Sequence, residues 1–114
     1  MERISFNGFN NNYATFKTSG TVKAGNAVSL NEDGCCVKSA EGDEVFGFCI
    51  SARGGYATVQ LQGYYEVKYS GDMPEFGIGY IVCDANAGVT PAEAGTKVKV
   101  VKINEDDETV GIIF

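Results

Sequence analysis

Few residues in this 114-residue chain could do chemistry, and histidine is absent altogether. Without histidine the sequence lacks the commonest general base, the usual partner of a serine or cysteine nucleophile, and a frequent metal ligand. Of the four cysteines, Cys35 and Cys36 are adjacent, whereas Cys49 and Cys83 are isolated. No C-x-x-C pair occurs, and adjacent strand residues point to opposite faces, which disfavours joint metal binding. We expect no metal site, and we expect Cys49 and Cys83 to be small buried hydrophobic residues.

Serines, glycines and carboxylates also lack a catalytic context. Ser51 and Ser70 are not part of a G-x-S-x-G turn. The segment 77–80 (G-I-G-Y) resembles a phosphate-binding glycine loop, but it precedes a predicted strand instead of following one. The acidic run at 105–108 lacks the ligand spacing of a calcium loop and predicts a charged turn. The chain is therefore predicted not to be an enzyme and to hold no cofactor, although a carboxylate pair assembled by the fold stays open.

Charge and hydropathy also bound the partners and the location. Fifteen acidic residues against nine basic ones give a net charge of −6, whereas phosphate binding needs clustered lysines and arginines. Lys97, Lys99 and Lys102 form the one basic cluster, with Lys97 and Lys99 on one strand face and Lys102 on the other. We expect a solvated strand, no nucleic-acid partner and no membrane. No apolar segment is long enough to span a bilayer and no secretory signal is recognisable, so a cytoplasmic origin is expected.

From residue 21 onward, short apolar-alternating segments are separated by turn residues such as Asp33-Gly34 and Gly54-Gly55. Strands are expected at 27–30, 35–38, 45–51, 56–62, 64–69, 80–83, 98–103 and 110–114. Seven to nine short strands at this spacing predict an all-β fold, either a small antiparallel β-barrel or a β-sandwich. Helix is limited to one turn, at 73–76 or 91–94, and no strong internal repeat is visible. The length allows one domain, assigned to residues 21–114.

Residues 1–20 differ in composition from the rest of the chain. Phe6, Phe9, Tyr13 and Phe16 are interspersed with asparagines and glycines, which are poor formers of regular structure. We interpret this segment as an extended N-terminal arm whose aromatic side chains dock on a neighbouring protein. Packing of the same rings onto the protein's own core is the alternative. If they dock on a neighbour, deletion of residues 1–18 leaves a folded domain with weakened attachment.

Tyrosines are concentrated in the middle of the chain. Tyr56, Tyr64, Tyr65 and Tyr69 are the candidates for an interaction surface, because tyrosine combines an apolar ring with a polar tip and is enriched at interfaces. Tyr64 and Tyr65 are neighbours in a predicted strand, so their side chains point to opposite faces. Ordinary core packing with scattered surface rings is the alternative interpretation.

Several motifs, taken in order, resemble the tailed-phage capsid decoration or head-stabilising proteins. Residues 22–28 (V-K-A-G-N-A-V) are similar to the V-x-A-G-[D/N]-x-V opening of that family. Similar pairs of strands follow at 45–48 with 53–60 and at 80–84 with 88–90, and 110–113 is similar to the final family strand. The resemblance covers residues 20–114. It implies a β-barrel-like domain that forms a homo-trimer and binds the major capsid protein on the outer surface of the capsid, hence a virion location after synthesis in the host cytoplasm.

Two other functions remain open at this point. One is another virion component, such as a tail or head-fibre module. The other is a small β-barrel module that binds a ligand or glycan through Tyr64, Tyr65 and Tyr69.

Overall fold

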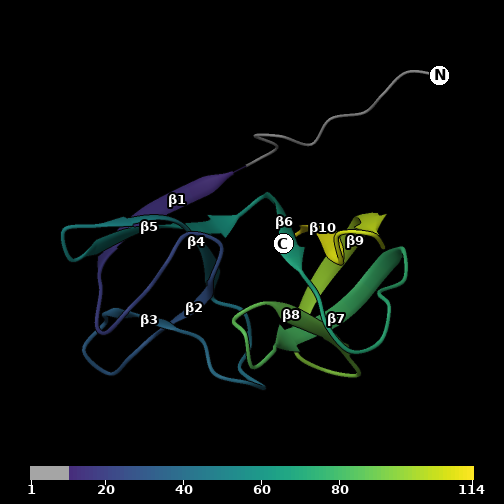
Figure 1. The fold of residues 1–114 in the computed structure, drawn as a ribbon, viewed down its shortest axis with the longest axis horizontal. Coiled ribbons are helices and arrows are strands. Elements are labelled where there is room, and N and C mark those ends of the chain that lie inside the picture. The colour runs from purple at the N-terminus through teal and green to yellow at the C-terminus, as the bar shows by residue number, and fades with distance from the viewer. Residues whose placement is uncertain (1–10) are drawn as a thin grey trace.

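Alternating apolar residues do form strands in the computed structural model, which describes residues 11–114. The described part is all-β, as predicted, and contains no helix (Figure 1). Its ten strands are β1 Asn12–Lys17, β2 Ala27–Leu30, β3 Cys36–Lys38, β4 Gly47–Arg53, β5 Tyr56–Gln62, β6 Tyr64–Lys68, β7 Gly77–Cys83, β8 Val89–Ala92, β9 Thr96–Asn104 and β10 Thr109–Ile113. The helical turn considered at 91–94 is wrong, because Pro91 and Ala92 pair with β7 as part of β8.

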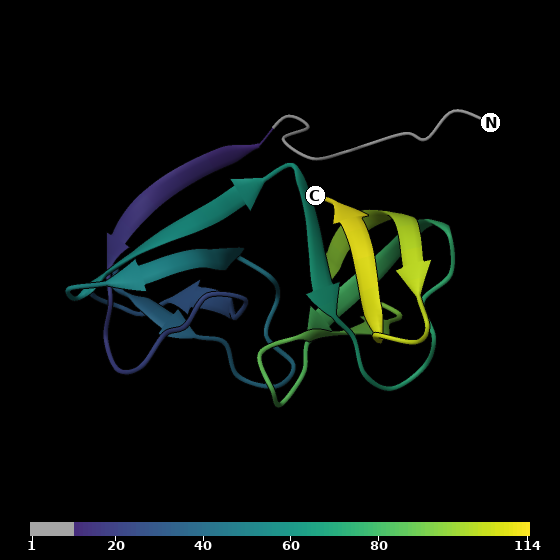
Figure 2. The same cartoon turned by 45° about the horizontal axis from the view of Figure 1, so that its top comes forward.

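The strands form two antiparallel five-stranded sheets packed together in a sandwich-like arrangement. The first sheet has the order β1-β5-β4-β2-β3 and the second has the order β6-β10-β9-β7-β8. Figures 1 and 2 show the first sheet, in purple to teal, beside the second, which runs from the teal of β6 to the yellow of β10. The first half of the chain (residues 12–62) therefore repeats its strand order in the second half (residues 64–113), and Gly63 alone joins β5 to β6.

Each sheet curls until its two edge strands meet, β1 with β3 and β6 with β8. Thr18, just after β1, forms a parallel bridge to Cys36 of β3, and Tyr69, just after β6, forms the same bridge to Val89 of β8. The next residues, Ser19 and Ser70, donate their backbone N–H groups to the carbonyls of Cys36 and Val89. Residues 17–20 (K-T-S-G) and 68–71 (K-Y-S-G) occupy these equivalent corners. This similarity is a trace in the sequence of the structural repeat.

The interior of each sheet holds a cluster of buried apolar side chains. In the first half the cluster comprises Val22, Val28, Cys36, Cys49, Ala57 and Val59. The cluster of the second half contains Val67, Tyr69, Ile81, Cys83, Val89, Val98, Val100, Val110 and Ile112, together with Ala27 and Phe48 from the first half. The phenyl ring of Phe48 stacks on Tyr65 at 4.5 Å between ring centroids and meets Phe114 edge-on at 5.2 Å. The two halves are thus joined through a shared apolar core.

Backbone hydrogen bonds fix the same junction. The N–H of Ala27 donates to the carbonyl of Ala87, and the N–H of Cys83 donates to the carbonyl of Asp43. Gly47 lies on the first-half side, where an added Cβ would be 2.6 Å from Val59 Cγ1 and 2.7 Å from the Gln60 carbonyl oxygen. Glycine at this position therefore allows β4 to approach β5 closely.

Part of the predicted N-terminal arm belongs to the first sheet. Residues 12–17 form β1, which pairs along its length with β5. The boundary predicted at residue 20 therefore does not separate an arm from the sheet. β1 itself contains a single asparagine, and its Tyr13, Thr15 and Phe16 are residue types that favour strands. Residues 1–10 lie outside the described part of the chain.

Candidate interaction surfaces

The four tyrosines predicted to form one interaction surface have different environments. Tyr64 and Tyr69 are buried, so assigning them to a surface is wrong. Tyr65 is partly buried and stacks on Phe48. Tyr56 is exposed at the start of β5. Tyr65 and Tyr69 face the core cluster of the second half, whereas the ring of Tyr64, on the other side of β6, is covered beside Gly111 of β10.

The buried Tyr64 serves a structural network in the second half. Its hydroxyl donates a 2.7 Å hydrogen bond to Glu66, which also forms an ion pair with Lys102 at 3.3 Å. Burial and the hydrogen bond to Glu66 raise the pKa of Tyr64, and the same hydrogen bond lowers the pKa of Glu66. The Tyr64 ring also occupies the space beside Gly111, where a Cβ would overlap its Cε1 at 2.9 Å.

The arm candidates divide in a similar way. Phe16 faces inward against the first-half core, and its ring meets Phe46 edge-on with 5.8 Å between centroids. Tyr13 points outward and is 52% exposed. Phe6 and Phe9 lie outside the described residues, so their predicted docking role stays a prediction. The alternative of core packing therefore holds for Phe16.

The structure brings two predicted residues, Tyr13 and Tyr56, to the outer face of β1 and β5. Tyr13 lies opposite Gln60, and Tyr56 lies opposite Lys17, so the two rings occupy opposite ends of this face. Arg53 of β4 pairs with Tyr56 and is also exposed. Exposed tyrosine and arginine are the residue types enriched in protein interfaces. We call Tyr13, Lys17, Arg53 and Tyr56 the tyrosine face.

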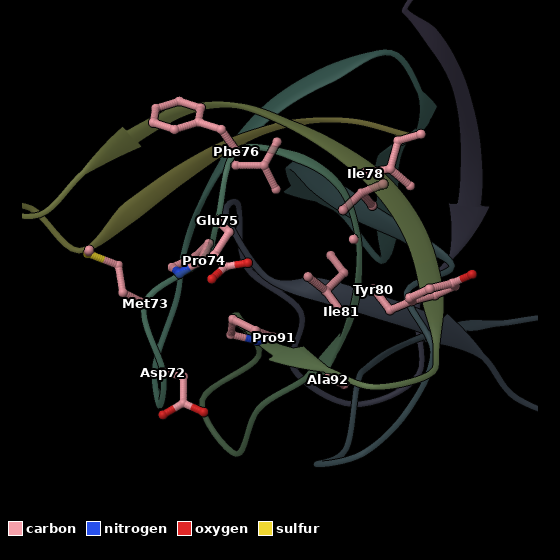
Figure 3. Close-up of a pocket in the computed structure, with 13 residues that line it drawn as sticks. Asp72, Met73, Pro74, Glu75, Phe76, Ile78, Tyr80, Ile81, Pro91 and Ala92 are labelled. Carbon is pink, nitrogen blue, oxygen red and sulfur yellow. The ribbon is translucent and has the colours of Figure 1, made fainter.

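A second exposed apolar surface, not predicted from the sequence, lies at β7. Phe76, Ile78 and Tyr80 are 69%, 66% and 42% exposed, and Met73 precedes them in the loop at 53%. They border a groove of about 310 Å³ whose floor includes Ile81 and Val98. Figure 3 shows Met73 and Phe76 on one side of this groove and Tyr80 on the other. Gly77 and Gly79 alternate with Phe76, Ile78 and Tyr80 in the sequence. This period-two apolar pattern indicates that the three side chains share one face of a strand.

Two lysines accompany these apolar residues. Lys99 pairs with Ile78 and Lys97 pairs with Tyr80 across β7 and β9, and both lysines are exposed. We call Ile78, Tyr80, Lys97 and Lys99 the β7–β9 face. An extra residue, Val101, bulges out of β9 opposite β10. The bulge resets the alternation so that Ile103 packs on the core and Lys102 is exposed, which corrects the expectation that Lys102 lies on the opposite face.

The cysteine thiols are in positions that suit core packing. Burial raises the pKa of the Cys36, Cys49 and Cys83 thiols, which lowers their nucleophilic thiolate fraction at neutral pH. Cys49 and Cys83 are fully buried, as predicted. Within residues 11–114, no three His, Cys, Asp or Glu side chains gather as a metal-ion cluster would require. The same residues include no helix long and apolar enough to cross a membrane.

Comparison with protein-family models, with curated proteins and with solved structures finds no match for this chain.

Proposed function

We propose that this chain is a non-enzymatic structural protein of a virion, which decorates and stabilises a phage capsid by binding the major capsid protein lattice from outside. The observation that carries the proposal is the tyrosine face, on which Tyr13 and Tyr56 are 52% and 55% exposed on the paired strands β1 and β5. Rigid aromatic side chains contribute large contact area at low cost in conformational entropy. The ordered motifs that resemble the decoration family support the same assignment.

Attachment to a lattice requires little affinity for each contact. Neighbouring binding sites on a shell raise the effective concentration of a protein that engages more than one of them. A homo-trimer presents three tyrosine faces at once, which fits this mode of binding. The net charge of −6 favours solubility before assembly and disfavours association with nucleic acid.

The test is to mix purified protein with expanded capsid shells of the cognate phage and to image them by electron microscopy. Regular added density on the outer surface is expected for the unmodified protein. The double variant Tyr13→Ser, Tyr56→Ser should lose most of that density. A matched control is Met73→Ser, which removes an exposed apolar side chain from the loop before β7 and should leave occupancy unchanged. Shells that stay bare with the unmodified protein would rule out the proposed function.

A ligand-binding role is the second candidate, favoured by the groove beside β7. Its volume of about 310 Å³ lies at the lower end of the usual range for small-molecule sites. Tyr64, Tyr65 and Tyr69, the tyrosines predicted to bind a ligand, do not line this groove. Its lining includes Tyr80, Pro91 and Ala92 instead. A saturable rise in melting temperature with one ligand class, removed by Tyr80→Ser, would favour this function.

A further inference from the structure

The repeated topology allows the same face to be compared in both halves. In the first half, Ala27 of β2 pairs with Phe48 of β4. In the second half, the corresponding strands β7 and β9 pair Ile78 with Lys99 and Tyr80 with Lys97. Both sets of side chains lie on the side of the sheet that faces away from its own core cluster.

In the first half this pair of residues is completely covered. Ala27 and Phe48 are 0% exposed because the second half packs over them. In the second half, by contrast, Ile78 is 66% exposed and Tyr80 42% exposed. The repeat thus leaves one copy of a covered face open, and the open copy carries large apolar side chains. Exposed apolar surface fixed on strands marks an interaction site.

The first half carries a groove of opposite charge. Leu30 and Phe46 are 37% and 38% exposed, and they line it together with Asp43 and Glu44. This surface therefore pairs two apolar side chains with two carboxylates, whereas the β7–β9 face pairs two apolar side chains with two ammonium groups. We call Leu30, Asp43, Glu44 and Phe46 the acidic groove.

We propose that the β7–β9 face binds the acidic groove of a second copy of this chain. Ile78 and Tyr80 pack on Leu30 and Phe46, and Lys97 and Lys99 lie against Asp43 and Glu44. Each copy carries both surfaces, so the contact can join successive copies into a closed ring. The proposal names the contact for the self-association that the proposed function expects, and it rests on that function for its biological setting.

Charge reversal tests this contact without disturbing the core, because Lys97, Lys99 and Glu44 are exposed. Sedimentation velocity of the unmodified protein should show an oligomer that weakens as salt is added, since exposed ion pairs are screened. The double variant Lys97→Glu, Lys99→Glu and the separate variant Glu44→Lys should each sediment as a monomer with unchanged circular dichroism. Arg53→Glu, a charge reversal on the tyrosine face, is the matched control and should stay oligomeric.

Mixing the two monomeric variants gives the decisive measurement. The lysine variant keeps an intact acidic groove and the Glu44 variant keeps an intact β7–β9 face, so the two together restore one unmodified contact. Across the other pair of surfaces the introduced carboxylates face the introduced ammonium group, so the mixture should regain an oligomer that contains both variants. A monomeric unmodified protein, or charge reversals that leave the oligomer intact, would overturn the proposal. Shell decoration by a monomeric unmodified protein would refute this contact alone, whereas an oligomer that never binds shells would refute the proposed function alone.

Discussion

The two halves of this protein share one backbone plan and differ in what covers it. Both have the same strand order and the same parallel bridge between the two edge strands of the sheet, β1 with β3 and β6 with β8. Both also have a bulge in the fourth strand along the chain, in β4 opposite β5 and in β9 opposite β10. On the second and fourth strands, Ala27 and Phe48 are buried in the first half, whereas Ile78 and Tyr80 on the same side of the second strand of the other half are exposed. Since the backbone is equivalent, the difference lies in the side chains and their partners. Each half therefore serves as an internal reference for the other.

The hairpins between the second and third strands sharpen this comparison. Asn31 Oδ1 accepts the N–H groups of Asp33 and Cys35, and Asp84 Oδ1 accepts those of Asn86 and Gly88. The residue with left-handed φ is Gly34 in the first hairpin and Ala87 in the second. The first hairpin is mostly exposed, whereas Asp84 and Ala87 are buried at the junction. One turn geometry is thus kept in two different environments.

The largest effect is expected at the covered face. Phe48→Ala removes a fully buried ring from the junction and should destabilise the protein by about 3–5 kcal/mol in urea unfolding. Lys99→Ala changes the corresponding open face and should alter stability by less than about 0.5 kcal/mol. Equal effects at the two positions would mean that Lys99 supports the fold of the single chain as much as Phe48 does, and they would break the comparison.

Most strands could be predicted from the sequence because their alternation is local. The range 56–62 matches β5, and Asp33-Gly34 correctly marks the turn between β2 and β3. β1 is not expected because its residues are grouped with the asparagine-rich segment before them, although Tyr13, Thr15 and Phe16 favour a strand. The start of β8 is expected only through the family resemblance, because Pro91 lowers strand propensity and pairing with β7 decides its structure. The repeat escaped detection because buried positions require only apolar residues of suitable size, so the two halves diverge in sequence.

The surfaces could be predicted less well than the strands. Tyr56 is exposed as predicted, but the burial of Tyr64 beside Gly111 and of Tyr69 in the second-half core depends on strands distant in sequence, which local sequence does not encode. Similarly, the placement of Lys102 depends on the Val101 bulge in β9. The sequence evidence for the β7–β9 face is the alternation of Phe76, Ile78 and Tyr80 with the glycines at 77 and 79, a pattern that also resembles a glycine loop.

The second largest effect is expected at the two hairpin caps. Asp84→Ala removes the acceptor for two backbone N–H groups and for the Ser70 hydroxyl at a buried site. It should cost about 3 kcal/mol, since hydrogen bonds to buried charged groups are the more valuable ones. Asn31→Ala removes the same pair of backbone contacts at a more exposed site and should cost about 1 kcal/mol. Urea midpoints would measure both, and a reversed order would contradict the assigned environments.

A smaller effect is expected from the left-handed residue of the open hairpin. Gly34 has φ +75° and no atom within 4 Å of an added Cβ, so Gly34→Ala tests backbone strain without a steric clash. The cost should be about 1 kcal/mol. Gly79→Ala in β7 is the control, because that site is equally open and lacks the positive φ. Thermal unfolding should separate the two variants by a few degrees, and identical melting temperatures would exclude a strain contribution at Gly34.

The smallest effect concerns acid stability, and it belongs to the second half alone. Glu66 occupies the place that Thr15 holds in β1, as the bridges after the two strands align them. The Tyr64 hydroxyl, assisted by Lys102, lowers the pKa of Glu66 below its ordinary 4.5. A carboxyl group with a lowered pKa in the folded state stabilises the protein above pH 4.5, and this stabilisation is lost as the pH falls through the lowered value. The unmodified protein should therefore lose more stability between about pH 6 and about pH 3 than Glu66→Gln does.

Partial exposure of Glu66 keeps this difference small, so it is best measured as a difference between two urea series at matched pH values. Tyr64→Phe removes the main hydrogen bond but leaves Lys102, and it should give a pH dependence between those of the unmodified protein and Glu66→Gln. Thr15→Val, at the equivalent position of the first half, should shift stability by the same amount at every pH. Neither threonine nor valine titrates in this range. A pH-dependent effect of Thr15→Val would therefore mean that titrating groups of the first half also contribute to the acid response.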